Sequence, residues 1–171
     1  MPRYVALLRG VSPMNAKMSE LKRCFEDAGF TNVKTVISSG NVVFDARRAS
    51  ESSLEKRIEA AMHQSLDRSF LTIVRSTDDL RALLATDPYS AFALPKNAKR
   101  VVTFLREINS SKLALPIKFS DAQILSVVDR DIFSAYVPGD KGPAFMRLIE
   151  KTFGTGVTTR TWETVKKCAA S

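Results

Sequence analysis

The sequence has 171 residues, of which 44% are hydrophobic and 26% are charged. This length fits one ordinary domain or two small halves, and this composition excludes an intrinsically disordered chain. The formal net charge is +8, but the 26 lysine and arginine residues occur in pairs at most, which excludes the long basic run of a nucleic-acid-binding arm.

Membrane and metal-binding classes are also disfavoured. No apolar stretch approaches the roughly 20 residues that span a membrane, and the N-terminus lacks the apolar core of a secretory signal, so we expect a cytoplasmic protein with no membrane partner. Cys24 and Cys168 form no C-x-x-C pair, and His63 is the only histidine. We therefore predict no metal site and no cofactor, with both cysteines serving as small hydrophobic residues.

The first half of the chain has the patterns of four strands and two helices. The predicted strands are residues 3–10, 33–38, 41–45 and 70–75, and the predicted helices are residues 18–28 and 54–66. Gly29 supplies the end of the first helix, and Ser39 and Gly40 predict a tight hairpin between the two middle strands. The resulting order, β-α-β-β-α-β, is the ferredoxin-like or split βαβ arrangement.

A connecting segment follows, beginning with a predicted helix start at residues 76–79. Pro88 and Pro95 then bracket a loop that carries Tyr89 and Phe92, and this loop is the expected domain boundary. The predicted organisation is an N-terminal half of residues 1–85, a connecting loop of residues 86–98, and a C-terminal half of residues 99–171.

The second half repeats the pattern of the first, though not its residues. The predicted strands are residues 100–106, 124–128, 132–137 and 157–160, and the predicted helices are residues 110–115, 145–153 and a terminal helix from Trp162. Pro116 is expected to end the first of these helices. The predicted fold class is therefore α+β, with two ferredoxin-like (split βαβ) halves that have antiparallel sheets and packed helices, plus a C-terminal helix.

Two basic residues stand where anions are commonly bound. Arg9 leaves a buried strand at Gly10, and Lys141 lies among glycines just before a predicted helix. Backbone N–H groups of such loops, together with a fixed cation, bind anions. The alternative is that Gly10 only permits a turn while Arg9 pairs with a carboxylate.

Two further sites have both a structural and a functional interpretation. Asn41 follows Gly40, which favours a hairpin turn, with a ligand-binding amide as the alternative. Trp162 begins the amphipathic terminal helix, which favours an anchor to the core. Alternatively, Arg160 joins Arg9 on one surface and Trp162 offers its ring for base or sugar stacking.

Three motifs in this order resemble those of domain-of-unknown-function family 1697, an uncharacterised family of small bacterial proteins. They are Tyr4-x-x-Leu7-Leu8-Arg9-Gly10, Ser39-Gly40-Asn41-Val42-x-Phe44 and Arg160-x-Trp162-x-Thr164-Val165. The resemblance implies an α+β fold with ferredoxin-like halves and implies no particular activity.

The chain departs from that family's pattern at two places. Residues 11–15 lack the asparagine and double glycine that the pattern has after the first motif, and Thr161 and Glu163 replace asparagines in the third. If this loop binds a ligand in relatives, Pro13 and Met14 change its backbone freedom, and the activity is then altered here.

The leading hypothesis is a binding module for an anionic ligand, either nucleic acid or a phosphorylated small molecule such as a nucleotide. Its candidate ligand-binding residues are Arg9, Gly10, Asn41, Lys141, Arg160 and Trp162. One alternative is an enzyme with an unrecognised active site near Arg9 and Asn41, although no familiar catalytic motif is present and no catalytic residue is identified. The other is an interaction scaffold or homodimer that uses the loop of residues 86–98.

Overall fold

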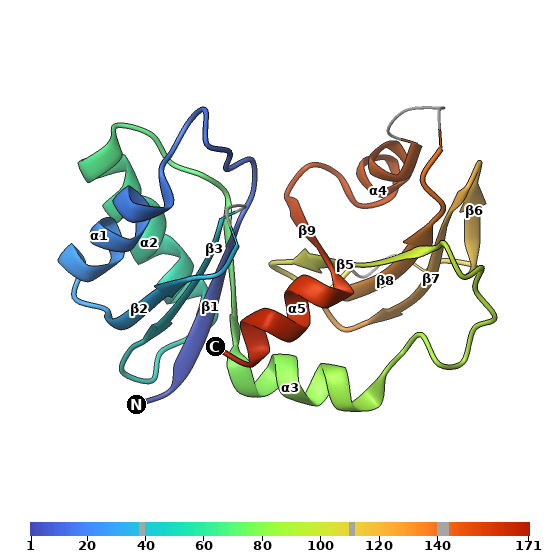
Figure 1. Ribbon diagram of the computed structural model, residues 1–171, viewed down its shortest axis with the longest axis horizontal. Helices are drawn as coiled ribbons and strands as arrows, with labels where there is room; N and C mark the ends of the chain where they lie inside the picture. Colours follow the sequence, from blue (N-terminus) through green and yellow to red (C-terminus); the bar gives the residue numbers. More distant parts are fainter. Residues whose placement is uncertain (38–39, 110–111, 140–143) are drawn as a thin grey trace. The chain divides into compact units, whose positions relative to one another are not determined.

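The computed structural model describes residues 1–37, 40–109, 112–139 and 144–171 (Figure 1). These residues form two compact units. The first unit comprises residues 1–83 and 164–171, and the second comprises residues 84–163. Residues 164–171, predicted to belong to the second half, are part of the first unit, where the Nε of Arg3 donates to the carbonyl oxygen of Ser171 at 2.8 Å.

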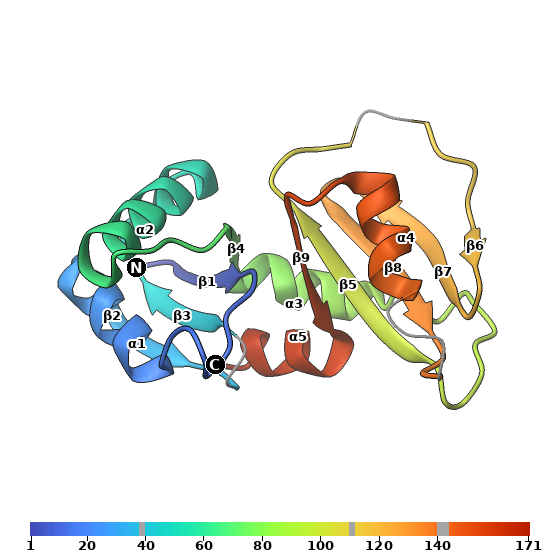
Figure 2. The ribbon, with the colours of Figure 1, turned by 90° about the horizontal axis from the view of Figure 1, so that it is seen from above.

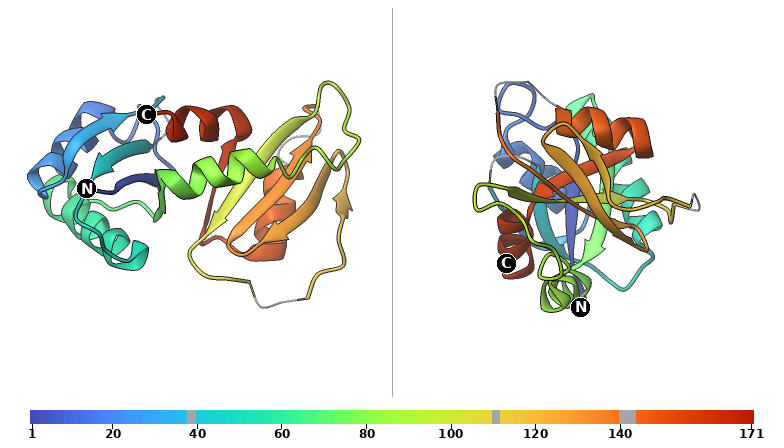
Figure 3. Two further views of the ribbon diagram at one scale, coloured as in Figure 1. Left: turned by 90° about the horizontal axis from the view of Figure 1, so that it is seen from below. Right: turned by 90° about the vertical axis from the view of Figure 1, so that its right-hand side faces the viewer.

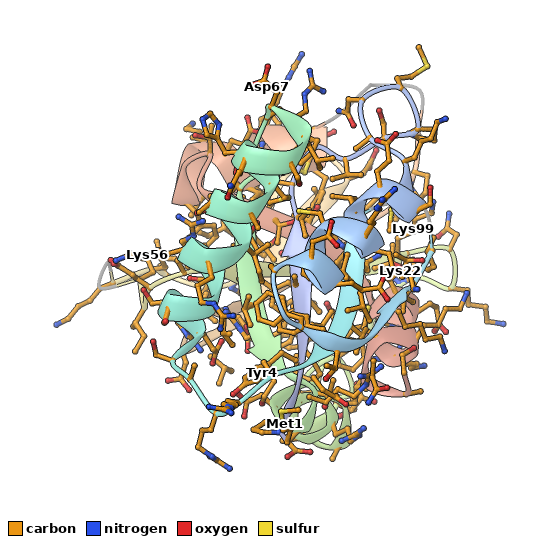
Figure 4. All side chains as sticks on the ribbon, turned by 90° about the vertical axis from the view of Figure 1, so that its left-hand side faces the viewer. Met1, Tyr4, Lys22, Lys56, Asp67 and Lys99 are labelled. Carbon is orange, nitrogen blue, oxygen red and sulfur yellow. The ribbon has the colours of Figure 1, made fainter. Side chains whose placement is uncertain are left out.

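The first unit contains an antiparallel sheet in the order β2-β3-β1-β4. Its strands are β1 (Arg3–Leu8), β2 (Thr31–Thr35), β3 (Asn41–Asp45) and β4 (Thr72–Ser76). Helices α1 (Met18–Asp27) and α2 (Glu51–Leu66) cover one face of this sheet (Figures 2 and 4). With β1 and β3 in the centre, this is the split βαβ arrangement expected from the sequence.

The core of the first unit is built around Phe44 of β3, which is fully buried. Its ring centroid lies 4.6 Å from that of Phe30, 5.6 Å from that of Phe25 and 5.8 Å from that of Tyr4. These separations suit tilted and edge-on aromatic packing. The aromatic cluster therefore joins the central strands to α1.

Three glutamates of α2, spaced one helical turn apart, face the edge strand β4. The buried Glu55 accepts a hydrogen bond from the backbone N–H of Val74 at 2.9 Å, and Glu59 accepts one from that of Thr72 at 3.1 Å. Glu51 lies 3.5 Å from the buried Arg75. We call Glu51, Glu55 and Glu59 the glutamate series. It occupies the outer side of β4, where an unpaired edge would otherwise present backbone donors to another chain.

The second unit contains an antiparallel sheet in the order β6-β7-β8-β5-β9. Its strands are β5 (Lys99–Leu105), β6 (Ile117–Phe119), β7 (Ala122–Val128), β8 (Asp131–Tyr136) and β9 (Val157–Thr161). Helix α4 (Ala144–Phe153) packs on one face of this sheet through Phe145, Leu148 and Ile149 (Figure 2). Helices α3 (Thr77–Thr86) and α5 (Trp162–Ala169) each include residues of both units.

The predicted α+β class with two antiparallel sheets, packed helices and a C-terminal helix is confirmed. One predicted element is wrong, because residues 112–115 form no helix and the unpredicted strand β6 follows them. Proline disfavours helical geometry in the residue before it, and here Pro116 follows Leu115. Ile117 pairs instead with Ile124 of β7.

Among the described residues, every helix is too short or too polar to cross a membrane.

Asp45 at the end of β3 makes the first unit sensitive to acid. Asn32 donates to this carboxylate at 2.6 Å and Arg3 at 2.8 Å, and these contacts hold the pKa of Asp45 below its ordinary range. The folded state then binds fewer protons than the unfolded state, so this contribution is complete above the unfolded pKa of about 3.9 and is lost as pH falls through the lower folded pKa.

We predict that Asp45→Asn destabilises the protein at neutral pH and that this deficit shrinks as the pH falls below about 4. Urea unfolding of both proteins across a pH series measures the effect. Asp129→Asn is the matched control, because Asp129 is exposed in the turn between β7 and β8. A deficit that stays constant with pH would contradict the assignment.

Candidate anion-binding site

Arg9 and Gly10 lie at the end of β1, in a loop that is closed by its own hydrogen bonds. The backbone N–H of Arg9 donates to the carbonyl oxygen of Leu71 at 2.9 Å. Gly10 has a φ of +84°, a conformation that favours glycine. Its carbonyl accepts from the side-chain amide of Asn15 at 2.7 Å, and the Asn15 side-chain oxygen accepts from the N–H of Ser12 at 2.9 Å. Asn15 therefore determines the conformation of this loop.

Asn41 is the first residue of β3. Its side chain is fully buried, and its amide donates to the carbonyl oxygen of Val36 at 2.9 Å across the β2–β3 connection. The same connection contains Gly40, where an added Cβ would meet that of Val11 at 3.0 Å. Two residues singled out in the sequence, Ser39 and Lys141, lie outside the described residues.

Arg160 and Trp162 belong to the second unit and have little exposed surface. Arg160 is 9% exposed, and its Nη1 donates to the Oγ1 of Thr158 and to the carbonyl oxygen of Thr159, both at 2.7 Å. Trp162 is 4% exposed, with its ring edge-on to those of Tyr89 at 5.1 Å and Phe133 at 6.5 Å. This packing is that of an anchor for the start of α5. Because Arg9 belongs to the first unit, a surface shared by Arg9 and Arg160 stays a prediction.

Two pockets in the second unit share Ala98 and Arg100. The connecting segment leads into β5 in this part of the chain (Figure 3). The smaller pocket, of about 360 Å³, is lined by Ala98, Lys99, Arg100, Thr161, Trp162 and Glu163. The larger pocket, of about 500 Å³, includes Asp87, Tyr89, Phe92, Leu94, Lys96 and Arg100 in its lining. Volumes of this size are typical of small-molecule sites.

The walls of these pockets carry exposed cations beside buried aromatic rings. Lys96, Lys99 and Arg100 are all exposed (Lys99 is labelled in Figure 4). The guanidinium carbon of Arg100 lies 5.9 Å from the centroid of the Tyr89 ring, within the range of a cation–π contact. The Tyr89 hydroxyl donates to the carbonyl oxygen of Val101 at 2.6 Å, and burial raises the pKa of Tyr89. Tyr89 therefore stays neutral and serves as packing for Arg100.

This cluster of cations is absent from the residues predicted to bind an anion. Lys99-Arg100 is one of several basic pairs in the sequence, and the loop of residues 86–98 was expected to make partner contacts only under the scaffold alternative. The available signal was a basic pair at the first residues of a strand, directly after a proline-bracketed loop. The described residues contain no group of three or more histidine, cysteine, aspartate or glutamate side chains placed to hold a metal ion.

Comparison with known proteins gives a family and a fold. The family model described as protein of unknown function (DUF1697) matches residues 1–133. The solved structure of the conserved bacterial protein SP0830 from Streptococcus pneumoniae is similar with a TM-score of 0.70 and 21% sequence identity, over 99% of this chain and 97% of that chain. At this identity the likeness shows the fold alone. No curated protein matches the sequence.

Proposed function

The chain belongs to the DUF1697 family, whose function is unknown. For this chain we propose that the smaller pocket of the second unit binds a phosphate-bearing ligand. Lys99 and Arg100 supply the positive charge, and the remaining walls are formed by Ala98, Thr161, Trp162 and one carboxylate, that of Glu163. The net charge of +8 assists by attracting anions at long range.

The observation that carries this proposal is the coincidence of a concave surface with two adjacent exposed cations. A guanidinium group binds phosphate oxygens in a bidentate manner, and a lysine ammonium adds a compact charge. The packing of Arg100 against Tyr89 limits the motion of its side chain, so less entropy is lost when a ligand is bound. A basic pair on a flat helix surface has neither advantage.

We predict that Lys99→Ala and Arg100→Ala each weaken phosphate binding about tenfold or more, because a hydrogen bond to a charged group contributes about 1.5–3 kcal/mol. Isothermal titration calorimetry with inorganic phosphate, repeated across a salt series, measures the affinity. Fluorescent single-stranded RNA serves as a second probe, because binding of a nucleic acid would show a steeper salt dependence.

The matched controls are Lys151→Ala and Arg147→Ala, which remove exposed cations from α4 in the same unit. Arg9→Ala tests the strand end that the sequence favoured. If the control variants lose as much phosphate affinity as the pocket variants, the effect is due to net charge alone and the proposal is wrong. Absence of phosphate binding at low salt would also overturn it.

The two alternative functions find less support in the geometry. An active site near Arg9 and Asn41 requires a reachable Asn41 amide, but this side chain is buried and donates to Val36. Self-association through the loop of residues 86–98 stays a prediction. Light scattering at high protein concentration measures it.

A further inference from the structure

The larger pocket contains a buried acceptor that the proposed anion site does not use. Asp87 lines this pocket, and its Oδ1 is buried without a hydrogen-bond partner among the residues that the structure describes. A buried carboxylate oxygen with no donor is costly. A ligand in this pocket that carries an N–H or O–H group would offer Asp87 the donor that it lacks among the described residues.

Hydrogen bonds fix the backbone at Asp87. Asp87 has a φ of +39°, a conformation that aspartate and asparagine tolerate better than most residues. Its carbonyl oxygen accepts from the backbone N–H of Ser90 at 3.2 Å and from the Ser90 hydroxyl at 2.8 Å. The hydroxyl of Tyr89 donates to the carbonyl oxygen of Val101, so it is not a donor for the Asp87 carboxylate.

The remaining walls of the larger pocket supply apolar and aromatic surface. Phe92 and Leu94 are half-buried and line it together with Pro95. Arg100 lines both this pocket and the smaller one. One ligand can therefore place a phosphate against Lys99 and Arg100 while its body lies against Phe92 and Leu94.

We infer that the ligand of the two adjoining pockets is a nucleoside phosphate, whose sugar hydroxyls or base N–H groups donate to Asp87. This inference rests on the proposed function, since the phosphate is bound by Lys99 and Arg100. A nucleotide combines the three features that the walls require: an anionic group, hydrogen-bond donors a short distance away, and a flat ring for Phe92. Inorganic phosphate has only the first.

Calorimetry with adenosine 5′-monophosphate, ribose 5-phosphate and inorganic phosphate tests the inference on the full chain. Wild type should bind the nucleotide at least tenfold more tightly than inorganic phosphate, with ribose 5-phosphate between them. Asp87→Asn should weaken nucleotide binding about tenfold, because a carboxylate accepts more strongly than an amide oxygen. The same substitution should leave inorganic phosphate binding unchanged or stronger, because it removes a nearby negative charge.

The opposite responses of the two ligands separate recognition by Asp87 from simple repulsion. If Asp87→Asn shifts both affinities in the same direction, or the nucleotide binds no more tightly than inorganic phosphate, the inference is overturned while the anion site stands. If neither the nucleotide nor inorganic phosphate binds at low salt, both the inference and the proposed function are wrong.

The matched control is Asp129→Asn, since Asp129 also has a positive φ, of +53°, but lies in the exposed β7–β8 turn. Circular dichroism checks that each variant is folded.

Phe92→Ala gives an independent test that leaves Asp87 in place. It should weaken nucleotide binding and spare inorganic phosphate, and an unchanged preference for the nucleotide would count against the inference.

Discussion

Replacement of Trp162 by alanine is expected to destabilise the protein by about 3–5 kcal/mol, the usual cost of truncating a large aromatic residue in a core. Trp162 is almost fully buried between Tyr89 and Phe133, and it stands at the first position of α5. Its loss removes both aromatic contacts and leaves a cavity at the start of the helix. Urea unfolding followed by far-UV circular dichroism measures the change, because the variant lacks the only tryptophan.

Trp162→Phe is the matched variant, since it keeps an aromatic ring and should cost less than half as much. The pair also distinguishes the two roles that the sequence allowed for Trp162. A residue that stacks on a ligand at the surface would affect binding with little change in stability. A destabilisation by alanine below about 1 kcal/mol would therefore contradict the anchoring role.

Replacement of Glu55 by leucine is expected to destabilise the first unit by about 1–3 kcal/mol, the cost of leaving a buried donor unsatisfied. The donor is the backbone N–H of Val74, which lies on the edge strand β4 and donates to the Glu55 carboxylate at 2.9 Å. Leucine matches the volume of glutamate approximately, so the lost acceptor rather than a cavity dominates the change. Chemical unfolding of the two proteins at pH 7 measures the difference.

Glu55→Gln is the control, because the amide oxygen of glutamine still accepts from Val74 while the charge is removed. This variant should be more stable than the leucine variant. Equal losses would show that the charge of Glu55 matters more than its hydrogen bond. Because β4 is an edge strand, the leucine variant should also self-associate more readily, and light scattering of the folded protein detects this.

The positions of most helices and strands could be predicted because they depend on local periodicity. The apolar spacing of Leu54, Ile58 and Met62 determines one face of α2 whatever it packs against. Strand β6 was missed because it has only three residues, of which Lys118 and Phe119 are exposed. Such a segment has too few buried positions to show a periodic signal, and its pairing with β7 depends on a neighbouring hairpin.

The candidate anion site stays a prediction, and the residues now proposed for it differ from those chosen from the sequence. The expectation of basic residues at strand ends remains in the proposal, with Lys99 and Arg100 in the central role. Arg160 and Asn41 have suitable chemistry in the sequence, but the Nη1 of Arg160 donates to Thr158 and the side-chain amide of Asn41 donates to Val36. Whether a side-chain donor bonds within the protein depends on which carbonyl or hydroxyl oxygen lies nearby in the folded chain. The spacing of residues in the sequence does not predict this.

By itself, the sequence determined the α+β class, the two antiparallel sheets and the aromatic and aliphatic residues available for their cores, because burial of apolar side chains follows periods of two and 3.6 residues. Only the tertiary structure decided which polar groups are satisfied. It brought Glu55 to the N–H of Val74, and it left Asp87 Oδ1 without a donor among the described residues. It also joined residues 98–100 with residues 161–163 in one pocket. The physical reason is that hydrogen bonds and pockets depend on distances of a few ångströms between segments far apart in sequence, and those distances are set by packing.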